Sequence, residues 1–147
     1  MKRILVLVAA VFLSIGSLRA ADAPWLTDFA AAEKKAAAEN KPLVLDFTGS
    51  DWCGWCIRLD KEVFSQPEFV SYAEKNLVLV KLDFPHKKEI SDAEKAQNKA
   101  LAQKYKIRGY PTIVVLDPKG GQLGTLGYQK GGATNWIASL EKLTAKR

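Results

Sequence analysis

The chain has 147 residues, 48% of them apolar and 26% charged, which is typical of a single globular domain. Its formal net charge is +6, but Lys2, Arg3 and Arg19 lie in the first twenty positions, where no acidic residue occurs. Without that segment the basic count falls from 22 to 19 against 16 acidic residues, which leaves a net charge of +3. Such a weak excess does not indicate a nucleic-acid-binding protein.

The N-terminus has the pattern of an export signal. A basic start, Met1-Lys2-Arg3, precedes an apolar run over residues 4–15 and small residues near Ala20. This pattern predicts a signal peptide over residues 1–20, cleaved after Ala20, and a mature domain over residues 21–147 that is periplasmic or secreted. The apolar run is shorter than the roughly 20 residues that span a bilayer. An uncleaved membrane anchor is the alternative interpretation.

The remaining sequence alternates between helical and strand-like patterns. The expected helices cover about residues 29–39, 53–64, 67–75, 92–105 and 134–146, and the expected strands cover about residues 43–47, 77–83, 112–116 and 122–128. Residues 117–121, rich in proline and glycine, predict a hairpin between the last two strands. Strands separated by helices require parallel crossovers. The predicted fold class is therefore α/β, a central mixed sheet flanked by helices on both faces.

Helix ends and faces can also be predicted. Thr27 or Asp28 is expected to cap the first helix, Ser91 or Asp92 the fourth, and Thr134 the last. The predicted apolar faces of the last two helices comprise Ala96, Ala100, Leu101 and Tyr105 in one, and Trp136, Ile137, Leu140 and Leu143 in the other.

The two cysteines of the chain, Cys53 and Cys56, are spaced C-x-x-C between a predicted strand and a predicted helix. A helix N-terminus favours a thiolate, and the second cysteine is one turn away. Closing so short a loop removes little chain entropy, so a structural disulfide would stabilise the fold only slightly. Zinc needs about four ligands, and the one histidine, His86, lies in a separate loop where we expect it to be solvated. The pair is therefore predicted to be redox-active, with no metal or other cofactor.

From about residue 41 to residue 143 the sequence resembles the thioredoxin superfamily. The matching residues are Leu43-Val44-Leu45-Asp46-Phe47, Trp52-Cys53-Gly54-Trp55-Cys56, Val80-Lys81-Leu82-Asp83 and Ile107-Arg108-Gly109-Tyr110-Pro111-Thr112. The turn at residues 48–51, the helix break at 64–67 and the hairpin at 117–120 are similar to exported relatives such as the C-terminal domain of the reductant transporter DsbD. The resemblance implies a thioredoxin fold and thiol–disulfide exchange.

The resemblance also implies roles for individual residues. Cys53 corresponds to the exposed attacking cysteine, Cys56 to the buried resolving cysteine, and Pro111 to a cis-proline beside the active site. Asp46 corresponds to a buried acid below the cysteines and Lys81 to its partner on the neighbouring strand. This chain departs from ordinary thioredoxin in having one more residue between Asp46 and Cys53.

Asp46 lies inside an apolar strand, where a carboxylate is costly unless it is paired or protonated. We predict that its pKa is raised and that it accepts a proton from Cys56. The alternative is a residue at a strand end that is satisfied by backbone groups. Lys81 either pairs with Asp46 or extends from its strand to water.

Aromatic residues surround the cysteines and predict a substrate-binding surface. We expect Trp52 to pack against the sheet and Trp55 to be exposed, with Tyr110 and Pro111 lining the substrate groove. Gly54 and Trp55, which separate the cysteines, match neither the Gly-Pro of thioredoxin nor the Pro-His of DsbA. These two residues are expected to tune the reduction potential.

Together these features predict an exported, monomeric thiol–disulfide oxidoreductase that reduces disulfides in envelope proteins through its CGWC motif. A reductase in an oxidising compartment needs an electron donor, and a membrane reductant transporter is a candidate. An oxidase or isomerase of the same fold is the alternative for direction. A non-catalytic binding module built on the thioredoxin fold is the alternative for class.

Overall fold

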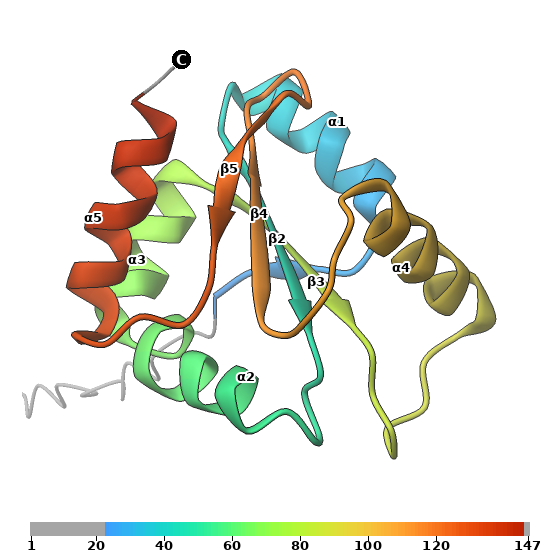
Figure 1. The fold of residues 1–147 in the computed structure, drawn as a ribbon. Helices are drawn as coiled ribbons and strands as arrows, with labels where there is room; N and C mark the ends of the chain where they lie inside the picture. Colours follow the sequence, from blue (N-terminus) through green and yellow to red (C-terminus); the bar gives the residue numbers. More distant parts are fainter. Residues whose placement is uncertain (1–22, 146–147) are drawn as a thin grey trace, which may run out of the picture.

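The computed structural model describes residues 23–145, so the predicted signal peptide lies outside the described residues. Five strands form one mixed sheet in the order β1-β3-β2-β4-β5, with helices on both faces (Figure 1). This confirms the predicted α/β thioredoxin fold. The elements are β1 (Trp25–Leu26), α1 (Phe29–Glu39), β2 (Leu43–Thr48), α2 (Gly54–Leu59), the π-helix η1 (Asp60–Phe64), α3 (Pro67–Asn76), β3 (Val78–Asp83), α4 (Asp92–Lys104), β4 (Thr112–Leu116), β5 (Gln122–Leu126) and α5 (Gly132–Thr144).

Strand β2 lies at the centre of the sheet. It pairs with β3 in parallel and with β4 in antiparallel orientation, and β4 forms the predicted hairpin with β5. Because β2 and β3 are parallel, the loops that follow them leave the sheet at the same edge. The cysteine motif follows β2, and the loop with His86 follows β3. The topology therefore brings together two segments that are more than thirty residues apart in the sequence.

Side chains alternate across the sheet and form two apolar cores. On one face, α2, η1, α3 and α5 cover the sheet, and the core includes Val44, Leu59, Phe64, Phe69, Leu79, Ile113, Val115 and Trp136. On the other face, α1 and α4 pack on a core that includes Phe29, Leu45, Phe47, Val80, Leu101, Val114 and Leu116. Successive strand residues point to opposite faces. Asp46 and Lys81 therefore point to the face of Val44 and Leu79, beneath α2 and η1.

Several predicted boundaries differ from the structure. The entry segment contains a two-residue strand, β1, which pairs with β3 in parallel and is too short to show a sequence period. The helix expected over residues 53–64 changes from α-helix to π-helix at Asp60. Thr134 does not cap the last helix, because Gly131 takes the N-cap position with φ 108°, a conformation that glycine adopts without steric cost.

The predicted apolar face of α5 is confirmed, but that of α4 is partly wrong. Ala96 and Ala100 are exposed, whereas Leu101 is buried and Tyr105 packs against the core. Asn98 faces inward instead and is fully buried, and its side-chain amide donates to the backbone carbonyl of Asp83 at 2.9 Å, which offsets the cost of burying it. Within residues 23–145, no helix combines the length and apolar character needed to cross a membrane.

Candidate active site

Cys53 and Cys56 form a disulfide at the N-terminus of α2. Cys53 is the N-cap residue in extended conformation, and its Sγ accepts a hydrogen bond from the backbone N–H of Cys56 at 3.2 Å. This bond satisfies one of the N–H groups that a helix leaves free at its first turn. The same N–H and the helix dipole would stabilise a negative charge on Cys53 after reduction.

Both cysteines are largely covered in the disulfide form. Cys56 is 4% exposed, as expected for a buried cysteine, but Cys53 is only 7% exposed, so the expectation of an exposed attacking cysteine is wrong for this form. The N-cap position explains the difference, because it turns the side chain of Cys53 back over the first helical turn. Three large apolar residues of the same segment are exposed instead: Trp52, Trp55 and Ile57.

Asp46 is 4% exposed, and its Oδ1 is buried without a hydrogen-bond partner among the described residues. Burial raises the pKa of this carboxyl from 3.8 to about 7; the positive charge of Lys81 lowers it, and the negative charges of Asp60 and Asp83 raise it further. This confirms the prediction that the pKa of Asp46 is raised. Within residues 23–145 no backbone group donates to this oxygen, which disagrees with the alternative of a carboxylate satisfied by backbone groups.

Lys81 lies opposite Asp46 in the register of β2 and β3, but its side chain is 29% exposed and its ammonium group contacts other partners. Its Nζ lies 3.8 Å from a carboxylate oxygen of Asp60, the first residue of η1, and 5.4 Å from the centre of the Trp25 ring. Among the described residues Lys81 therefore forms its ion pair with Asp60 rather than with Asp46, although its charge still lowers the pKa of Asp46. Asp60 was not singled out from the sequence, because its contact with Lys81 depends on the course of the π-helix.

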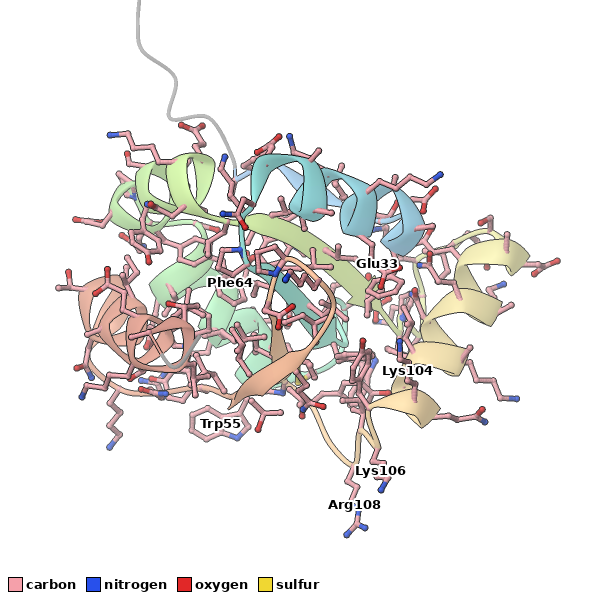
Figure 2. All side chains as sticks on the ribbon, turned by 90° about the horizontal axis from the view of Figure 1, so that it is seen from above. Glu33, Trp55, Phe64, Lys104, Lys106 and Arg108 are labelled. Carbon is pink, nitrogen blue, oxygen red and sulfur yellow. A yellow bond between two sulfur atoms is a disulfide. The ribbon has the colours of Figure 1, made fainter. Side chains whose placement is uncertain are left out.

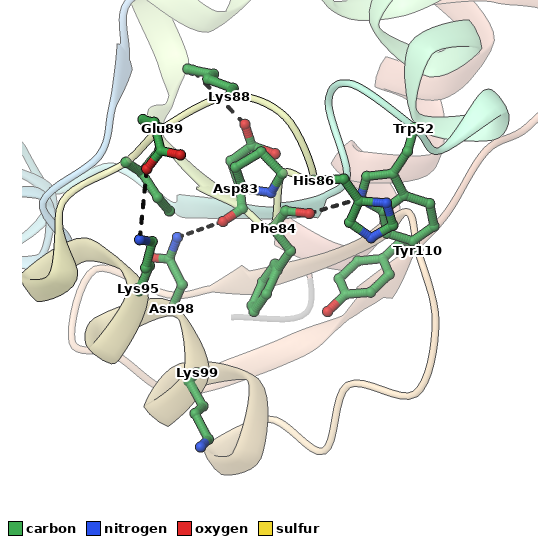
Figure 3. Close-up of a pocket in the computed structure, with 12 residues that line it drawn as sticks. Trp52, Asp83, Phe84, His86, Lys88, Glu89, Lys95, Asn98, Lys99 and Tyr110 are labelled. Atoms are coloured by element: carbon green, nitrogen blue, oxygen red, sulfur yellow. Dashed lines mark hydrogen bonds and ion pairs between the residues drawn. The ribbon is translucent and has the colours of Figure 1, made fainter.

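The expectation that Trp52 packs against the sheet is wrong. The residue is 42% exposed, its ring stacks on His86 with 4.5 Å between ring centres, and its Nε1 donates to the carbonyl of Phe84 at 2.7 Å. His86 is exposed, as expected, but its ring also stacks on Trp52. The physical reason is the common edge of the sheet, since the turn after β2 places Trp52 over the loop after β3 (Figure 3).

Asp51 fastens these two segments together and was missed in the sequence. Its carboxylate accepts backbone hydrogen bonds from His86 at 2.9 Å, Lys87 at 2.6 Å and Lys88 at 2.9 Å. These bonds, above all those from His86 and Lys88, lower its pKa to about 2. No sequence signal identifies these partners, because they lie 35 to 37 residues away.

Asp83 reinforces the same connection from the end of β3. Its carboxylate is 3% exposed and accepts hydrogen bonds from the backbone N–H of Ser50 at 2.9 Å and from its hydroxyl at 2.5 Å. The turn of residues 49–52 and the loop of residues 84–88 are thus joined from both sides. We call this arrangement, the hydrogen bonds of Asp51 and Asp83 that join the two segments, the active-site interlock.

Trp55 projects from the other side of the cysteine motif, where it is 55% exposed, as predicted (Figure 2). The guanidinium of Arg58 lies 5.6 Å from the centre of its ring and 5.2 Å from that of Tyr128. Glu62 holds this group by accepting from Arg58 Nε at 2.6 Å and from the Tyr128 hydroxyl at 2.7 Å. These two hydrogen bonds lower the pKa of Glu62, and the first raises that of Arg58. Trp55 thus lies beside a charged group that is hydrogen-bonded to Glu62.

Tyr110 and Pro111 lie between α4 and β4, and the ring of Tyr110 lies beside that of Trp52. The peptide bond between them is cis, and the Tyr110 ring is 5.8 Å from that of Trp52 and 5.2 Å from that of Phe84. Gly54 is exposed, and a Cβ built at this position would meet no atom within 4 Å. Its side of the motif is therefore open.

The described residues do not form a metal centre. Across residues 23–145, no three His, Cys, Asp or Glu side chains are grouped so that they could hold an ion. The chemistry available to the site is that of the cysteine pair and the buried carboxyl beneath the same helix.

Comparisons with known proteins agree with this geometry. A family model described as a thioredoxin-like domain matches residues 29–143. The disulfide bond reductase DsbH of Chlamydia pneumoniae is 33% identical over 124 residues, which cover 84% of this chain and 74% of that protein. The thiol:disulfide interchange protein DsbD of Cronobacter sakazakii is 34% identical over 88 residues, but the chain spans only 14% of that longer protein.

Solved structures give the same result. A structure of the DsbH oxidoreductase matches with a TM-score of 0.81 and 30% identity, covering 95% of this chain and 96% of the other. The reduced C-terminal domain of Neisseria meningitidis DsbD matches with a TM-score of 0.59 and 27% identity, covering 77% and 91%. The chain therefore belongs to the thioredoxin-like domain family and is a thioredoxin-like oxidoreductase.

Proposed function

We propose that this protein reduces disulfide bonds in proteins of the bacterial envelope by dithiol exchange. The observation that carries the proposal is the Cys53–Cys56 pair, which caps α2 above a buried carboxyl that titrates near neutral pH. The similarity to the disulfide bond reductase DsbH supports the reductive direction. The signal-like residues 1–20 support export.

In the proposed reaction, the thiolate of Cys53 attacks one sulfur of a substrate disulfide. A mixed disulfide forms between Cys53 and the substrate, and the other substrate sulfur leaves as a thiolate. Cys56 then attacks the sulfur of Cys53, which forms the Cys53–Cys56 disulfide and releases the second substrate sulfur. Two electrons have passed to the substrate, and an external dithiol donor must return two electrons to the enzyme.

Asp46 is the proposed proton acceptor for Cys56. A thiol must lose its proton before it attacks, and a carboxylate with a pKa of about 7 can take that proton near neutral pH. The face of the sheet to which Asp46 points is the face covered by α2, the helix that contains Cys56. Lys81 lies opposite Asp46 in the sheet and pairs with the partly exposed Asp60, so these two residues lie between the carboxyl and the protein surface.

The residues between the cysteines support the proposed reductive direction. Gly54 and Trp55 supply no histidine, the residue that would strongly stabilise the Cys53 thiolate and so favour an oxidant. The exposed Trp52, Trp55 and Ile57 supply an apolar surface around the sulfur for contact with a protein substrate. A membrane reductant transporter is the proposed electron donor.

An insulin-reduction assay with dithiothreitol tests the activity. The residue 21–147 protein should accelerate insulin precipitation, and Cys53→Ser should abolish the acceleration. Cys56→Ser is the matched control, because it retains the attacking sulfur and should accumulate a mixed disulfide with the substrate. Equal rates with and without the protein would contradict an enzymatic function and favour the binding-module alternative.

The reduction potential of the Cys53–Cys56 pair tests the direction. Equilibration with glutathione redox buffers should give a value near that of thioredoxin, about −270 mV, rather than that of DsbA, about −120 mV. A potential near that of DsbA would replace the proposed reductase by an oxidase.

A further inference from the structure

A groove lined partly by basic residues begins at the turn of residues 49–52 and extends past the loop after β3 to the end of α4. Its first part is a hollow of about 610 Å³ whose lining includes Trp52, Phe84, Tyr110 and Lys99. A second hollow of about 350 Å³ adjoins it, shares Phe84 and Lys99, and adds Lys106 and Arg108. We call the surface that these six residues form across the two neighbouring hollows the basic groove. Figure 3 shows its aromatic end, and Figure 2 shows Lys106 and Arg108 projecting from the molecule beyond α4.

Some basic residues that line the two hollows are paired with acidic residues, and others are not. At the end near the interlock, Lys88 pairs with Asp83 at 3.9 Å, and Lys95 pairs with Glu89 at 4.0 Å. Lys99, Lys106 and Arg108 are exposed, and none of the three forms an ion pair with another residue in the described part of the chain. The groove therefore presents three cations that lack an internal counter-charge.

Aromatic rings connect this charge to the reacting sulfur. Trp52 is next to Cys53 in the chain, its ring contacts Tyr110, and Tyr110 contacts Phe84, with ring centres 5.8 Å and 5.2 Å apart. The interlock fixes the Trp52 end of this series, because Trp52 Nε1 donates to the Phe84 carbonyl. A peptide held at Cys53 could thus continue over the rings and bring its flanking residues to the three cations.

We propose that the basic groove binds an acidic segment that flanks the disulfide of the protein substrate. Charge complementarity carries the choice of partner, since carboxylates supply the counter-charge that Lys99, Lys106 and Arg108 lack. The aromatic end of the groove accepts apolar side chains nearer the disulfide. This inference rests on the proposed disulfide-exchange function and adds the chemical class of the substrate.

The test uses three synthetic peptides that contain the same internal disulfide and differ only in one flank, which carries three glutamates, three glutamines or three lysines. Reduced enzyme is mixed with each peptide, and release of peptide thiol is followed over time at low ionic strength. Hydroxyethyl disulfide, which is small and uncharged, reports exchange without contact with the groove. The groove variant is Lys99→Glu/Lys106→Glu/Arg108→Glu. The matched control is Lys119→Glu/Lys130→Glu/Lys142→Glu, which reverses three exposed cations outside both hollows.

The wild-type enzyme should react with the glutamate peptide roughly five to ten times faster than with the glutamine peptide, and the lysine peptide should be slowest. The preference should shrink in 0.5 M salt. The groove variant should lose or reverse it, whereas the control variant should retain most of it, and both should reduce hydroxyethyl disulfide like the wild type. The salt dependence of the wild-type preference tests the inference even if a variant does not fold.

Equal rates with all three peptides would overturn the inference while leaving the proposed function intact. The same is true if the control variant loses the preference as completely as the groove variant, because net charge rather than the groove would then be responsible. Failure to reduce any of the peptides or hydroxyethyl disulfide would instead contradict the proposed function itself.

Discussion

Replacing Asp46 by asparagine should stabilise the oxidised protein at alkaline pH. Burial raises the pKa of this carboxyl from 3.8 to about 7 despite the opposing charge of Lys81. The folded chain therefore holds a proton on Asp46 over a pH range in which the unfolded chain has released it. The stability associated with this proton is fully present below about pH 4 and is lost as the pH rises through about 7.

The structure gives the size of the effect. One pKa unit corresponds to about 1.36 kcal/mol, so the rise from 3.8 to about 7 corresponds to roughly 4 kcal/mol above pH 7. Asparagine has a similar size and is neutral at every pH, so it does not carry this cost. In urea unfolding of the oxidised proteins, the advantage of Asp46→Asn should grow by about 2–4 kcal/mol between pH 4 and pH 8.5. The intact disulfide keeps both cysteines from titrating in this experiment.

Asp92→Asn provides the comparison, because Asp92 is an exposed carboxylate in the first turn of α4. The difference in unfolding free energy between this variant and the wild type should change little over the same pH range. If Asp46→Asn also showed a constant difference, burial would not be disfavouring the charged carboxylate, and the reasoning would be refuted.

Three further predictions concern other parts of the structure. Asp51→Asn should accelerate hydrogen exchange at the amides of residues 86–88, which donate to this carboxylate. In the wild type, protection of these amides should persist until the pH falls from about 4 toward the Asp51 pKa of about 2. Unchanged exchange in the variant would contradict the interlock. Trp136→Ala should lower the urea unfolding free energy by about 3–5 kcal/mol, because a fully buried ring leaves a cavity. Gly54→Ala should keep or raise the melting temperature, with a gain of up to about 1 kcal/mol, since its Cβ meets no neighbour; a lower melting temperature would contradict this.

The parts of the fold that could be predicted depend on local sequence patterns. The apolar runs of β2 and β3, the Asp117–Gly121 turn and the Asp28 and Ser91 caps each act within a few residues. The change to a π-helix at Asp60 and the inward position of Asn98 depend on contacts with other elements. A period of apolar residues carries no information about those contacts, which is why Ala96 and Ala100 were wrongly expected to be buried.

The same distinction applies to the candidate site. Cys53, Cys56 and Asp46 are recognisable because a C-x-x-C pair and an acid inside an apolar strand are unusual in themselves. Asp51 resembles an ordinary turn residue, and its role becomes visible only when parallel pairing of β2 and β3 brings its amide partners within hydrogen-bond distance. The positions of Trp52 and His86 have the same origin.

The interlock has a consequence for protein engineering. The six residues from Asp51 to Cys56 are contiguous, so the simplest design would graft them alone into another thioredoxin-like scaffold. In this protein, however, Asp51 needs the backbone amides of a separate loop, and Trp52 needs the Phe84 carbonyl and a flat ring beneath it. A graft of the hexapeptide alone would leave these groups without partners. The smallest portable unit of this site is therefore two segments, the motif and the loop that follows β3.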